Sequence, residues 1–355
     1  MRSRYQRKIV DALFKMGPVW AVLGALAIGA VLIRAAGLDP VNVYASLING
    51  ALGSERALGV TLQKTVPLLF AGLGMAVAFR CDLVNLGGEG QIYIGALTAG
   101  SIALAFPFLP ALVMLPLCLI AAFVGGGVWG AIPGFLRAKY GRSEIITTIL
   151  MNFVGFWSVS FLLHGPLQES RGYYPQSELI PPAARLPIIW EAGDLHSGII
   201  LALVAAVGVY VLLWRTTVGY EIRAVGSNPK AAAYAGIPVV RSIVLAMLVS
   251  GGLMGLAGFA EVFGVQHRIS DFFSPGYGFD AIAVSLLGYT HPFGVTLAAL
   301  FFAALRTGFN SVERTQGLPR AMAQTVQGIT VLLLVISVIL PRLRRRLRRK
   351  ENESV

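Results

Sequence analysis

The stretch GSNPKAAAYAGIP, residues 226–238, separates two long apolar runs at 198–214 and 241–262. Asn228 favours a helix start, because its side-chain oxygen can accept hydrogen bonds from the unpaired backbone N–H groups of a first turn. Pro229 suits the first helical position, where a missing N–H costs nothing. The alanines that follow favour helix. The stretch therefore predicts a short polar helix between two segments that are apolar enough to cross a membrane.

The end of this helix is also predicted. Gly236 can adopt the left-handed conformation that closes many helices, and Pro238 prevents the helix from continuing. A helix of about two turns is unstable alone in water, so it needs a surface to lie on. Two interpretations follow: a connector that lies on its own bundle, or a contact for a groove of another protein.

The composition assigns the chain to a class. Of its 355 residues, 56% are hydrophobic and 13% are charged, whereas soluble domains carry about 25% charged residues. So little charge cannot cover so much apolar surface, which predicts an all-α polytopic membrane protein with a single transmembrane domain over 1–355. The formal net charge of +12 does not favour nucleic-acid binding, because no aromatic-basic motif accompanies the basic residues. Cys81 and Cys118 are expected to be buried apolar side chains.

About ten apolar runs are candidate transmembrane helices. They cover residues 18–36, 65–84, 86–106, 109–132, 145–163, 198–214, 241–262, 275–289, 293–310 and 321–341. The first run is not expected to be a secretory signal, because it continues into IRAAG without a small-residue cleavage pattern. In another run Ser250, Gly255 and Gly258 form a small-residue face, which predicts close packing between helices.

Positive charge orients this bundle. With both termini in the cytoplasm, the cytoplasmic segments hold 20 of the 29 Lys and Arg residues, in agreement with the positive-inside rule. This arrangement places 215–240 in the cytoplasm and 165–197 outside. The basic tail at 342–350 is expected to contact anionic lipid headgroups.

A polar cluster near 80–90 predicts a discontinuous span. Only 15 residues separate Lys64 from Arg80, and a helix of that length reaches roughly 22 Å, short of a hydrocarbon core about 30 Å thick. The cluster comprises Arg80, Asp82, Asn85, Glu89 and Gln91. Glu89 has two interpretations: an ion pair with Arg80 that stabilises the fold, or a contact with cargo inside the membrane.

Three residues of the run 145–163 lie at four-residue spacing and share one helix face. This face lines a cargo pathway in one interpretation and makes interhelical hydrogen bonds in the other. In the cluster near 80–90, the amides offer neutral donors and acceptors suited to sugar hydroxyls or a base edge. The candidate pathway residues are therefore Asn85, Glu89, Gln91, Thr148, Asn152 and Phe156.

The outside segment 165–197 is too long for a simple turn and is rich in proline and aromatic residues. Two interpretations stay open. The segment either receives a separate binding protein, whose basic residues would pair with its carboxylates, or caps the mouth of the bundle. Those carboxylates are Glu169, Glu178, Glu191 and Asp194.

No sequence motif for catalysis or metal binding is evident. The chain lacks the GxxxxGK[ST] phosphate-binding loop, so it is not itself a P-loop ATPase. It lacks HExxH and GxSxG, its four His residues are scattered, and Asp271 and Asp280 are too isolated to suggest a membrane enzyme. The chain is therefore expected to be a transport subunit rather than an enzyme.

The stretch GYEIRAVGSNPKAAAYAGI (219–237) resembles the coupling-helix segment of ABC-importer permeases, in the branch that includes ribose, nucleoside and branched-chain amino-acid permeases. Further stretches resemble the same family in the same order, so the resemblance covers most of the chain from about residue 60. They are FRCDLVNLGGEGQIYIGAL (79–97), GRSEIITTILMN (141–152), HGPLQE (164–169) and SPGYGFDAIAVSLLG (274–288). NLGGEGQ and HGPL are most similar to the nucleoside (purine/simple-sugar) permeases.

This resemblance implies a set of partners. The short helix would sit in a groove of a separate ABC ATPase, which binds ATP and Mg, while this chain binds no cofactor. A second permease subunit, identical or related, and an extracytoplasmic substrate-binding protein would complete the importer in a bacterial inner membrane. The residues that the resemblance assigns to ATPase coupling are Gly226, Asn228, Pro229, Lys230, Ala232, Tyr234, Ala235 and Gly236.

The implied function is ATP-driven import of nucleosides by alternating access. Ribose-like sugars and branched-chain amino acids are the alternatives within the family. A secondary transporter driven by an ion gradient is an alternative from a different class, and it would use Glu89 as a proton or sodium ligand.

Overall fold

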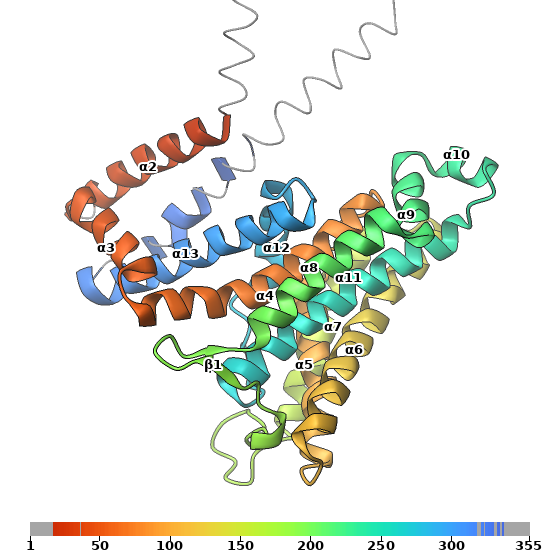
Figure 1. Cartoon of the computed structure of the whole chain (residues 1–355), viewed down its shortest axis with the longest axis horizontal. Coiled ribbons are helices and arrows are strands. Elements are labelled where there is room, and N and C mark those ends of the chain that lie inside the picture. The colour runs from red at the N-terminus through yellow and green to blue at the C-terminus, as the bar shows by residue number, and fades with distance from the viewer. Residues whose placement is uncertain are drawn as a thin grey trace, which may run out of the picture. The chain divides into compact units, whose positions relative to one another are not determined.

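The computed structural model describes residues 17–35, 37–317, 321–322, 324–329, 332–333 and 336. Helices dominate this part of the chain (Figure 1). In order they are α2 (Gly17–Ala35), α3 (Pro40–Leu52), α4 (Glu55–Arg80), α5 (Gly88–Ala105), α6 (Ala111–Tyr140), α7 (Glu144–Leu163), α8 (Gly198–Arg215), α9 (Thr217–Ser227), α10 (Pro229–Tyr234), α11 (Val239–Glu261), the π-helix η2 (Val262–Gln266), α12 (Tyr277–Leu287) and α13 (Pro292–Gln316). Between α7 and α8 lie the 3-10 helix η1 (Pro182–Ala184) and two antiparallel strands, β1 (Ile188–Trp190) and β2 (Leu195–His196).

The chain divides into two compact units, 1–58 with 304–355, and 59–303. The smaller unit has an apolar core that gathers side chains from α2, α3 and α13 and from the described residues beyond α13. This core comprises Ile33, Val43, Phe309, Val312 and Val326. All the candidate functional residues belong to the larger unit, so the site is built within one unit.

Six helices of the described chain are long and apolar enough to cross a membrane: α4, α6, α7, α8, α11 with η2, and α13. A seventh span results if the pair Leu26–Ala35 and Pro40–Leu52, which is bent by 116°, counts as one. The chain is therefore an all-α polytopic membrane protein. The count of ten is unconfirmed, because the run 86–106, which holds α5, is not among these six helices and the run 321–341 lies largely outside the described residues.

One predicted span is too short. The run 275–289 contains α12, which has 11 residues. At 1.5 Å per residue such a helix reaches about 16 Å, roughly half of a hydrocarbon core. The glycines that begin and end this apolar run shorten the helix, since Gly276 has φ +103° and Gly288 follows its last residue.

The expected short helix before residue 80 is wrong. α4 begins at Glu55 and has 26 residues, so it reaches about 39 Å and is a full-length span. Lys64 lies inside it, half-buried, and the neighbouring Gln63 donates from its side-chain amide to the carbonyl of Asp194. Lys64 does not mark a span boundary, because a long basic side chain can lie along a helix and keep its charge in a polar region. The helical break at 81–87 therefore follows a complete span.

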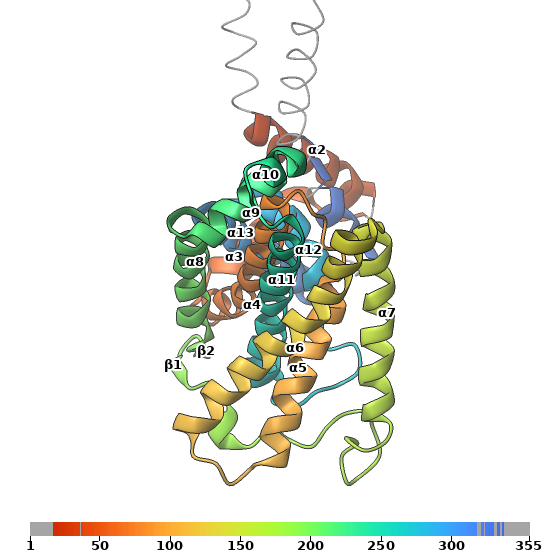
Figure 2. The same ribbon diagram turned by 90° about the vertical axis from the view of Figure 1, so that its right-hand side faces the viewer.

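Two helices occupy the centre of the larger unit. In the apolar membrane-spanning stretches of α4 and α11, 78% and 72% of the residues are buried, against 28% in each of α6, α7 and α8. The small-residue face of α11 allows this close approach, because a Cβ atom at Gly126 of α6 would lie 2.8 Å from Cα of Gly255. The predicted close packing of that face is confirmed. Figure 2 shows α5, α6 and α11 side by side, with α7 further out.

The segment 165–197 folds back on the chain around η2. Ser177 N–H donates to Ile269 O at 2.8 Å, Ile180 N–H to His267 O at 2.8 Å, and Leu186 N–H to Phe263 O at 2.9 Å. Because α8 connects this segment to α9, the two lie at opposite ends of one membrane-spanning helix. The segment is thus an ordered cover over one end of α11.

Candidate functional site

The start of α10 follows the prediction. Asn228 Oδ1 accepts hydrogen bonds from Lys230 N–H at 3.0 Å and from Ala231 N–H at 3.1 Å. Asn228 has extended backbone angles, and Pro229 occupies the first helical position. The N-cap predicted from Asn228 and Pro229 is therefore confirmed.

The end of α10 also follows the prediction. Gly236 has φ +81°, in the left-handed region that favours glycine. Ile237 N–H donates to Ala232 O and Gly236 N–H donates to Ala233 O, both at 3.0 Å. These two bonds form a Schellman motif, which satisfies the last carbonyls of a helix only two turns long.

The faces of α10 separate the residues assigned to coupling. Ala232 is the buried residue of the helix, at 4% exposure, so it packs against its own chain. Tyr234 is 95% exposed, and Lys230 and Ala233 are exposed as well. A large aromatic side chain held this far into solvent is unusual, and aromatic residues of this kind commonly anchor protein interfaces.

Gly226 connects α9 to the end of α4. A Cβ atom at position 226 would overlap the carbonyl oxygen of Arg80 and lie 2.9 Å from Cα of Cys81. Arg80 is fixed in turn, since its Nε donates to Thr290 O at 3.1 Å and its guanidinium lies 4.9 Å from the ring centre of Trp214. The segment 215–240, which is predicted to lie in the cytoplasm, is therefore in direct contact with the residues where the helical break begins.

The break leads to a buried group of polar side chains, which we call the amide cluster: Asn85, Gln91 and Ser250. Asn85 Nδ2 donates to Gln91 Oε1 and to Ser250 Oγ, each at 2.9 Å, and Gln91 Nε2 donates to Asn85 Oδ1 at 3.0 Å. Asn85 and Gln91 are 0% and 1% exposed. The amide cluster ties the break and α5 to the centre of α11.

Two further polar residues hold the start of α5. Asn152 Oδ1 accepts from Gly90 N–H at 2.8 Å, and Asn152 Nδ2 donates to Leu86 O at 2.6 Å. Glu89 Oε1 accepts from Gly278 N–H at 2.6 Å. The expected partner of Glu89 was Arg80, whereas these contacts connect Glu89 to α12 and Arg80 to the carbonyl groups that follow α12.

The other pathway candidates lie on α7. Thr148 is buried and its hydroxyl donates to Glu144 O at 2.6 Å within the helix. Phe156 is half-buried, and its ring contacts Tyr93, Trp157 and Phe272. The structure thus gathers all six pathway candidates around the beginning of α5 and the facing side of α7. Their role toward cargo stays a prediction.

Several residues beside these candidates were missed. The sequence predicts only packing for Ser250 and no site role for the isolated Asp271, and Gly278 offers only its backbone. Asp271 Oδ2 accepts from Ser160 Oγ at 3.0 Å. The four-residue spacing that joins 148, 152 and 156 extends to Ser160, and this signal could have found it.

Two of the carboxylates of 165–197 bind other residues of the same chain. Glu169 pairs with Arg268, at 3.3 Å between Oε2 and Nη1. Glu178 accepts from the hydroxyl and the N–H of Ser170, and these bonds lower the pKa of its carboxyl group. At least these two therefore have partners without a binding protein.

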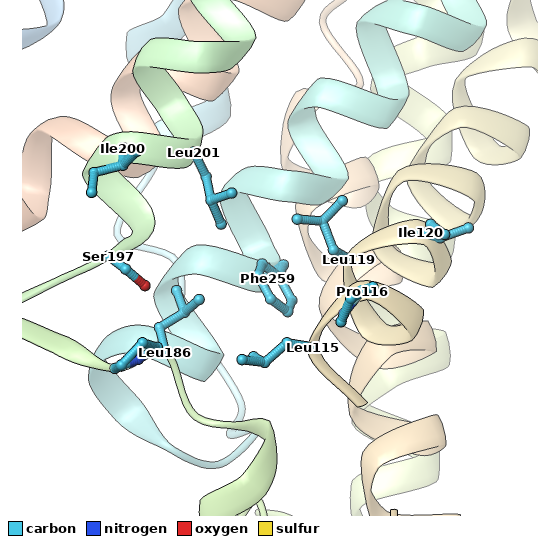
Figure 3. A pocket seen from close by; sticks show the side chains of 10 residues that line it. Leu115, Pro116, Leu119, Ile120, Leu186, Ser197, Ile200, Leu201 and Phe259 are labelled. Atoms are coloured by element: carbon cyan, nitrogen blue, oxygen red, sulfur yellow. The ribbon is translucent and has the colours of Figure 1, made fainter. Parts of the chain in front are cut away.

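An apolar cavity of about 450 Å³ lies between α6, α8, α11 and the segment before β1 (Figure 3). Its lining includes Leu115, Leu119, Leu186, Leu201 and Phe259. Only the Ser197 side chain offers a hydrogen-bonding group there, so the cavity does not suit a hydroxyl-rich or charged cargo. Within the described residues, no group of three or more His, Cys, Asp or Glu side chains is arranged to hold a metal ion.

Comparison with known proteins assigns the family. Residues 58–335 match the family of the branched-chain amino acid transport system permease component. The chain belongs to this family. The matched range begins where the larger compact unit begins, so this permease carries its amide cluster and α9–α10 within the matched region.

Three relatives of the permease are similar over almost their whole length. A glucose ABC transporter permease of Haloferax volcanii is 40% identical, over 95% of this chain and 92% of the relative. A nucleoside ABC transporter permease of Lactococcus lactis is 36% identical, over 92% and 93%. A guanosine ABC transporter permease of Bacillus subtilis is 36% identical, over 90% and 92%. The chain is therefore an ABC transporter permease of this branch, and such subunits are not themselves enzymes.

Proposed function

We propose that the chain is the membrane-spanning subunit of an ATP-driven importer that moves nucleosides across a bacterial cytoplasmic membrane by alternating access. The observation that carries this proposal is the similarity to nucleoside and guanosine permeases, at 36% identity over about nine tenths of both chains. A separate ABC ATPase supplies the work, with ATP and Mg bound on that subunit.

The ATPase engages the exposed side of α10. Tyr234 and Lys230 offer an aromatic and a cationic contact, while the two capping motifs keep this short helix formed without a partner. The other residues assigned to coupling, from Gly226 to Gly236, position this surface rather than make the contact. Ala232 in particular packs inward.

Movement of α10 reaches the membrane through backbone contact. Gly226, in the last turn of α9, lies against Arg80 and Cys81, and the chain from Cys81 leads directly to the amide cluster. A displacement of α9–α10 therefore acts on the start of α5 and, through Ser250, on α11. The work of ATP biases an equilibrium between outward-facing and inward-facing arrangements of these helices.

The orientation follows from charge. Arg223 and Lys230 lie in α9 and α10, and Arg215 and Arg241 lie in the helices on either side. By the positive-inside rule, this basic charge supports a cytoplasmic position for this end of α8. In this proposal both termini lie in the cytoplasm, because the basic residues at the two ends of the sequence favour that side. The opposite end, with 165–197, receives a substrate-binding protein through exposed aromatic residues such as Tyr173, which is 81% exposed. A second permease subunit completes the pathway within the lipid bilayer.

Glucose-like sugars are the second candidate cargo, because the relative with 40% identity is a glucose permease. Branched-chain amino acids follow from the family description alone. A transporter driven by an ion gradient is disfavoured, since the carboxylate of Glu89 already accepts from Gly278 N–H at 2.6 Å.

Purification with the products of neighbouring genes tests the proposal. An ABC ATPase should co-elute, and vesicles that hold both should accumulate radiolabelled nucleoside only with ATP and binding protein. Unlabelled nucleosides should compete for uptake better than glucose, ribose or leucine. Uptake driven by a proton or sodium gradient without ATP would contradict the assignment as an ATP-driven importer. Stronger competition by glucose than by nucleosides would identify glucose as the cargo.

A further inference from the structure

One face of α7 continues beyond the predicted pathway candidates. Asn152, Phe156, Ser160 and His164 follow one another at four-residue spacing and therefore share a helix face. The loop between η2 and α12 runs between α5 and α7 beside this face, in cyan in Figure 2. Asn152 and Ser160 are 8% and 5% exposed, Phe156 is half-buried and His164 is exposed, so the chain covers part of this face.

Aromatic rings from three elements meet in the middle of this face. The ring centres of Phe156 and Phe272 are 4.7 Å apart, and those of Phe156 and Tyr93 are 5.5 Å apart in an edge-to-face arrangement. Tyr93 also contacts Phe273, at 4.4 Å between ring centres. Phe272 differs from the others because it is 74% exposed.

The backbone holds Phe272 in an unfavourable conformation. Its φ is +55°, which is a genuine outlier for a bulky residue. The residues on either side are anchored, since Asp271 N–H donates to Pro175 O at 3.2 Å and Gln266 Nε2 donates to Phe273 O at 3.0 Å. Strained residues kept in place by their surroundings concentrate at ligand sites. Phe272 contacts Phe156 within the chain, but it stays 74% exposed.

A carboxylate lies beside the rings. Asp271 Oδ2 accepts from Ser160 Oγ at 3.0 Å and lies 3.9 Å from His164 Nδ1. Ser160 is one helical turn, about 5.4 Å along the axis, from Phe156. A carboxylate with free lone pairs can accept hydrogen bonds from sugar hydroxyl groups.

We propose that Phe156 and Phe272 form a subsite that stacks on the planar base of the cargo, while Asp271 accepts hydrogen bonds from its ribose hydroxyls. This inference rests on the proposed import of nucleosides. A nucleoside joins an aromatic ring directly to a polyol and so uses both parts of the subsite. A hexose has no aromatic π face, and an amino acid brings a carboxylate that Asp271 repels.

Photolabelling locates the subsite without any mutation. Vesicles that hold the permease, its ATPase and the binding protein are illuminated with an azido-purine nucleoside, and the labelled peptides are mapped. Labels should fall within 152–160 and 268–276 and should disappear with excess unlabelled nucleoside. Labelling confined to other spans would overturn the assignment.

Substitutions then separate the two roles. Phe272→Leu and Phe156→Leu should each raise the nucleoside concentration for half-maximal uptake about tenfold, since base–aromatic stacking contributes substantially to binding. Phe272→Tyr keeps the ring and should restore uptake. Asp271→Asn should weaken competition by nucleosides but leave competition by the free nucleobase nearly unchanged. Phe161→Leu is the matched control, because Phe161 lies on α7 with Phe156 and is 75% exposed, against 74% for Phe272. It should behave as wild type.

The outcomes distinguish this inference from the proposed function. If the wild-type importer accumulates nucleosides with ATP but Phe272→Leu has the same half-saturation as Phe161→Leu, the subsite is wrong and the importer stands. If the wild type transports only sugars or amino acids, both fail. Loss of competition by the free base in Asp271→Asn would contradict the assigned role of the carboxylate.

Discussion

Gly226 lies so close to Cys81 that a Cβ atom at position 226 would be 2.9 Å from Cα of Cys81. The contact joins the last residues of α9 to the first residue of the break after α4. Backbone meets backbone there, with no flexible side chain between them. A movement of α9–α10 is therefore transmitted to the break with little loss.

Gly226→Ala should disturb this contact. The added methyl group overlaps the carbonyl oxygen of Arg80, which cannot move without shifting the end of α4. We expect a loss of about 1–3 kcal/mol in the free energy of unfolding, and fewer cargo molecules transported per ATP hydrolysed. Thermal unfolding in detergent and coupled uptake measurements in vesicles check both. Gly208→Ala is the control, because a Cβ atom there meets nothing within 4 Å; an equal effect of the two substitutions would contradict the role of the contact.

Tyr234→Ala should weaken ATPase binding without unfolding the chain. The side chain is 95% exposed, and exposed substitutions usually change stability by less than about 0.5 kcal/mol. Loss of an aromatic interface anchor costs about 2 kcal/mol or more, or roughly 30-fold in the dissociation constant. Titration of purified ATPase against the permease measures this. Tyr173→Ala, at the opposite end of the larger unit, should leave binding unchanged.

Ala232→Trp should act differently from Tyr234→Ala. Ala232 is 4% exposed, so a Trp side chain cannot fit without displacing α10 from its own bundle. We expect a lower unfolding temperature as well as loss of ATPase binding. A variant with wild-type stability and no ATPase binding would show instead that Ala232 itself faces the partner.

Asn85→Ala should destabilise the fold, because Gln91, Ser250 and Gly87 N–H all lose a buried hydrogen-bond partner. Each unsatisfied buried group costs about 1–3 kcal/mol. Gln91→Ala should then cost less in the Asn85→Ala background than in the wild type, and a double-mutant cycle on unfolding measures the difference. Strict additivity would mean that the two amides act independently. Asn49→Ala, at an exposed position, controls for loss of an amide.

His196 should make the fold sensitive to acid. Burial lowers the pKa of this imidazole to about 4, and the nearby His267 lowers it further while Asp194 opposes the shift. The folded protein therefore favours the neutral ring, and the unfolded chain, with a pKa near 6.5, binds the proton more readily. The stabilisation is complete above about pH 6.5 and is lost as the pH falls toward 4.

Between pH 7 and pH 5 this difference amounts to about 2 kcal/mol of unfolding free energy. His196→Gln keeps an acceptor for Gly198 N–H, which donates to His196 Nδ1 at 3.1 Å, and removes the titrating ring. We expect this variant to lose less stability between pH 7 and pH 5 than the wild type. His291→Gln should keep the wild-type dependence, and the same dependence in His196→Gln would exclude this imidazole as its source.

The class of the protein and the local structure of α10 could be predicted from the sequence. Long apolar runs with so little charge are stable in lipid and not in water. Asn228, Pro229 and Gly236 specify where the helix begins and ends, through bonds to residues nearby in the chain. Such features depend on residues that are close in sequence, so no tertiary knowledge is needed to predict them.

The contacts between distant polar groups could not be predicted and are seen only in the folded chain. Hydrogen bonds join Ser250 to Asn85, Gly278 to Glu89 and Asp271 to Ser160, each across more than 100 residues of sequence. The structure also shows that α4 extends through Lys64 and that α12 is too short to span a bilayer. Buried hydrogen bonds form where packing brings a donor close to an acceptor. The order of residues in the sequence does not show which distant residues packing will bring together.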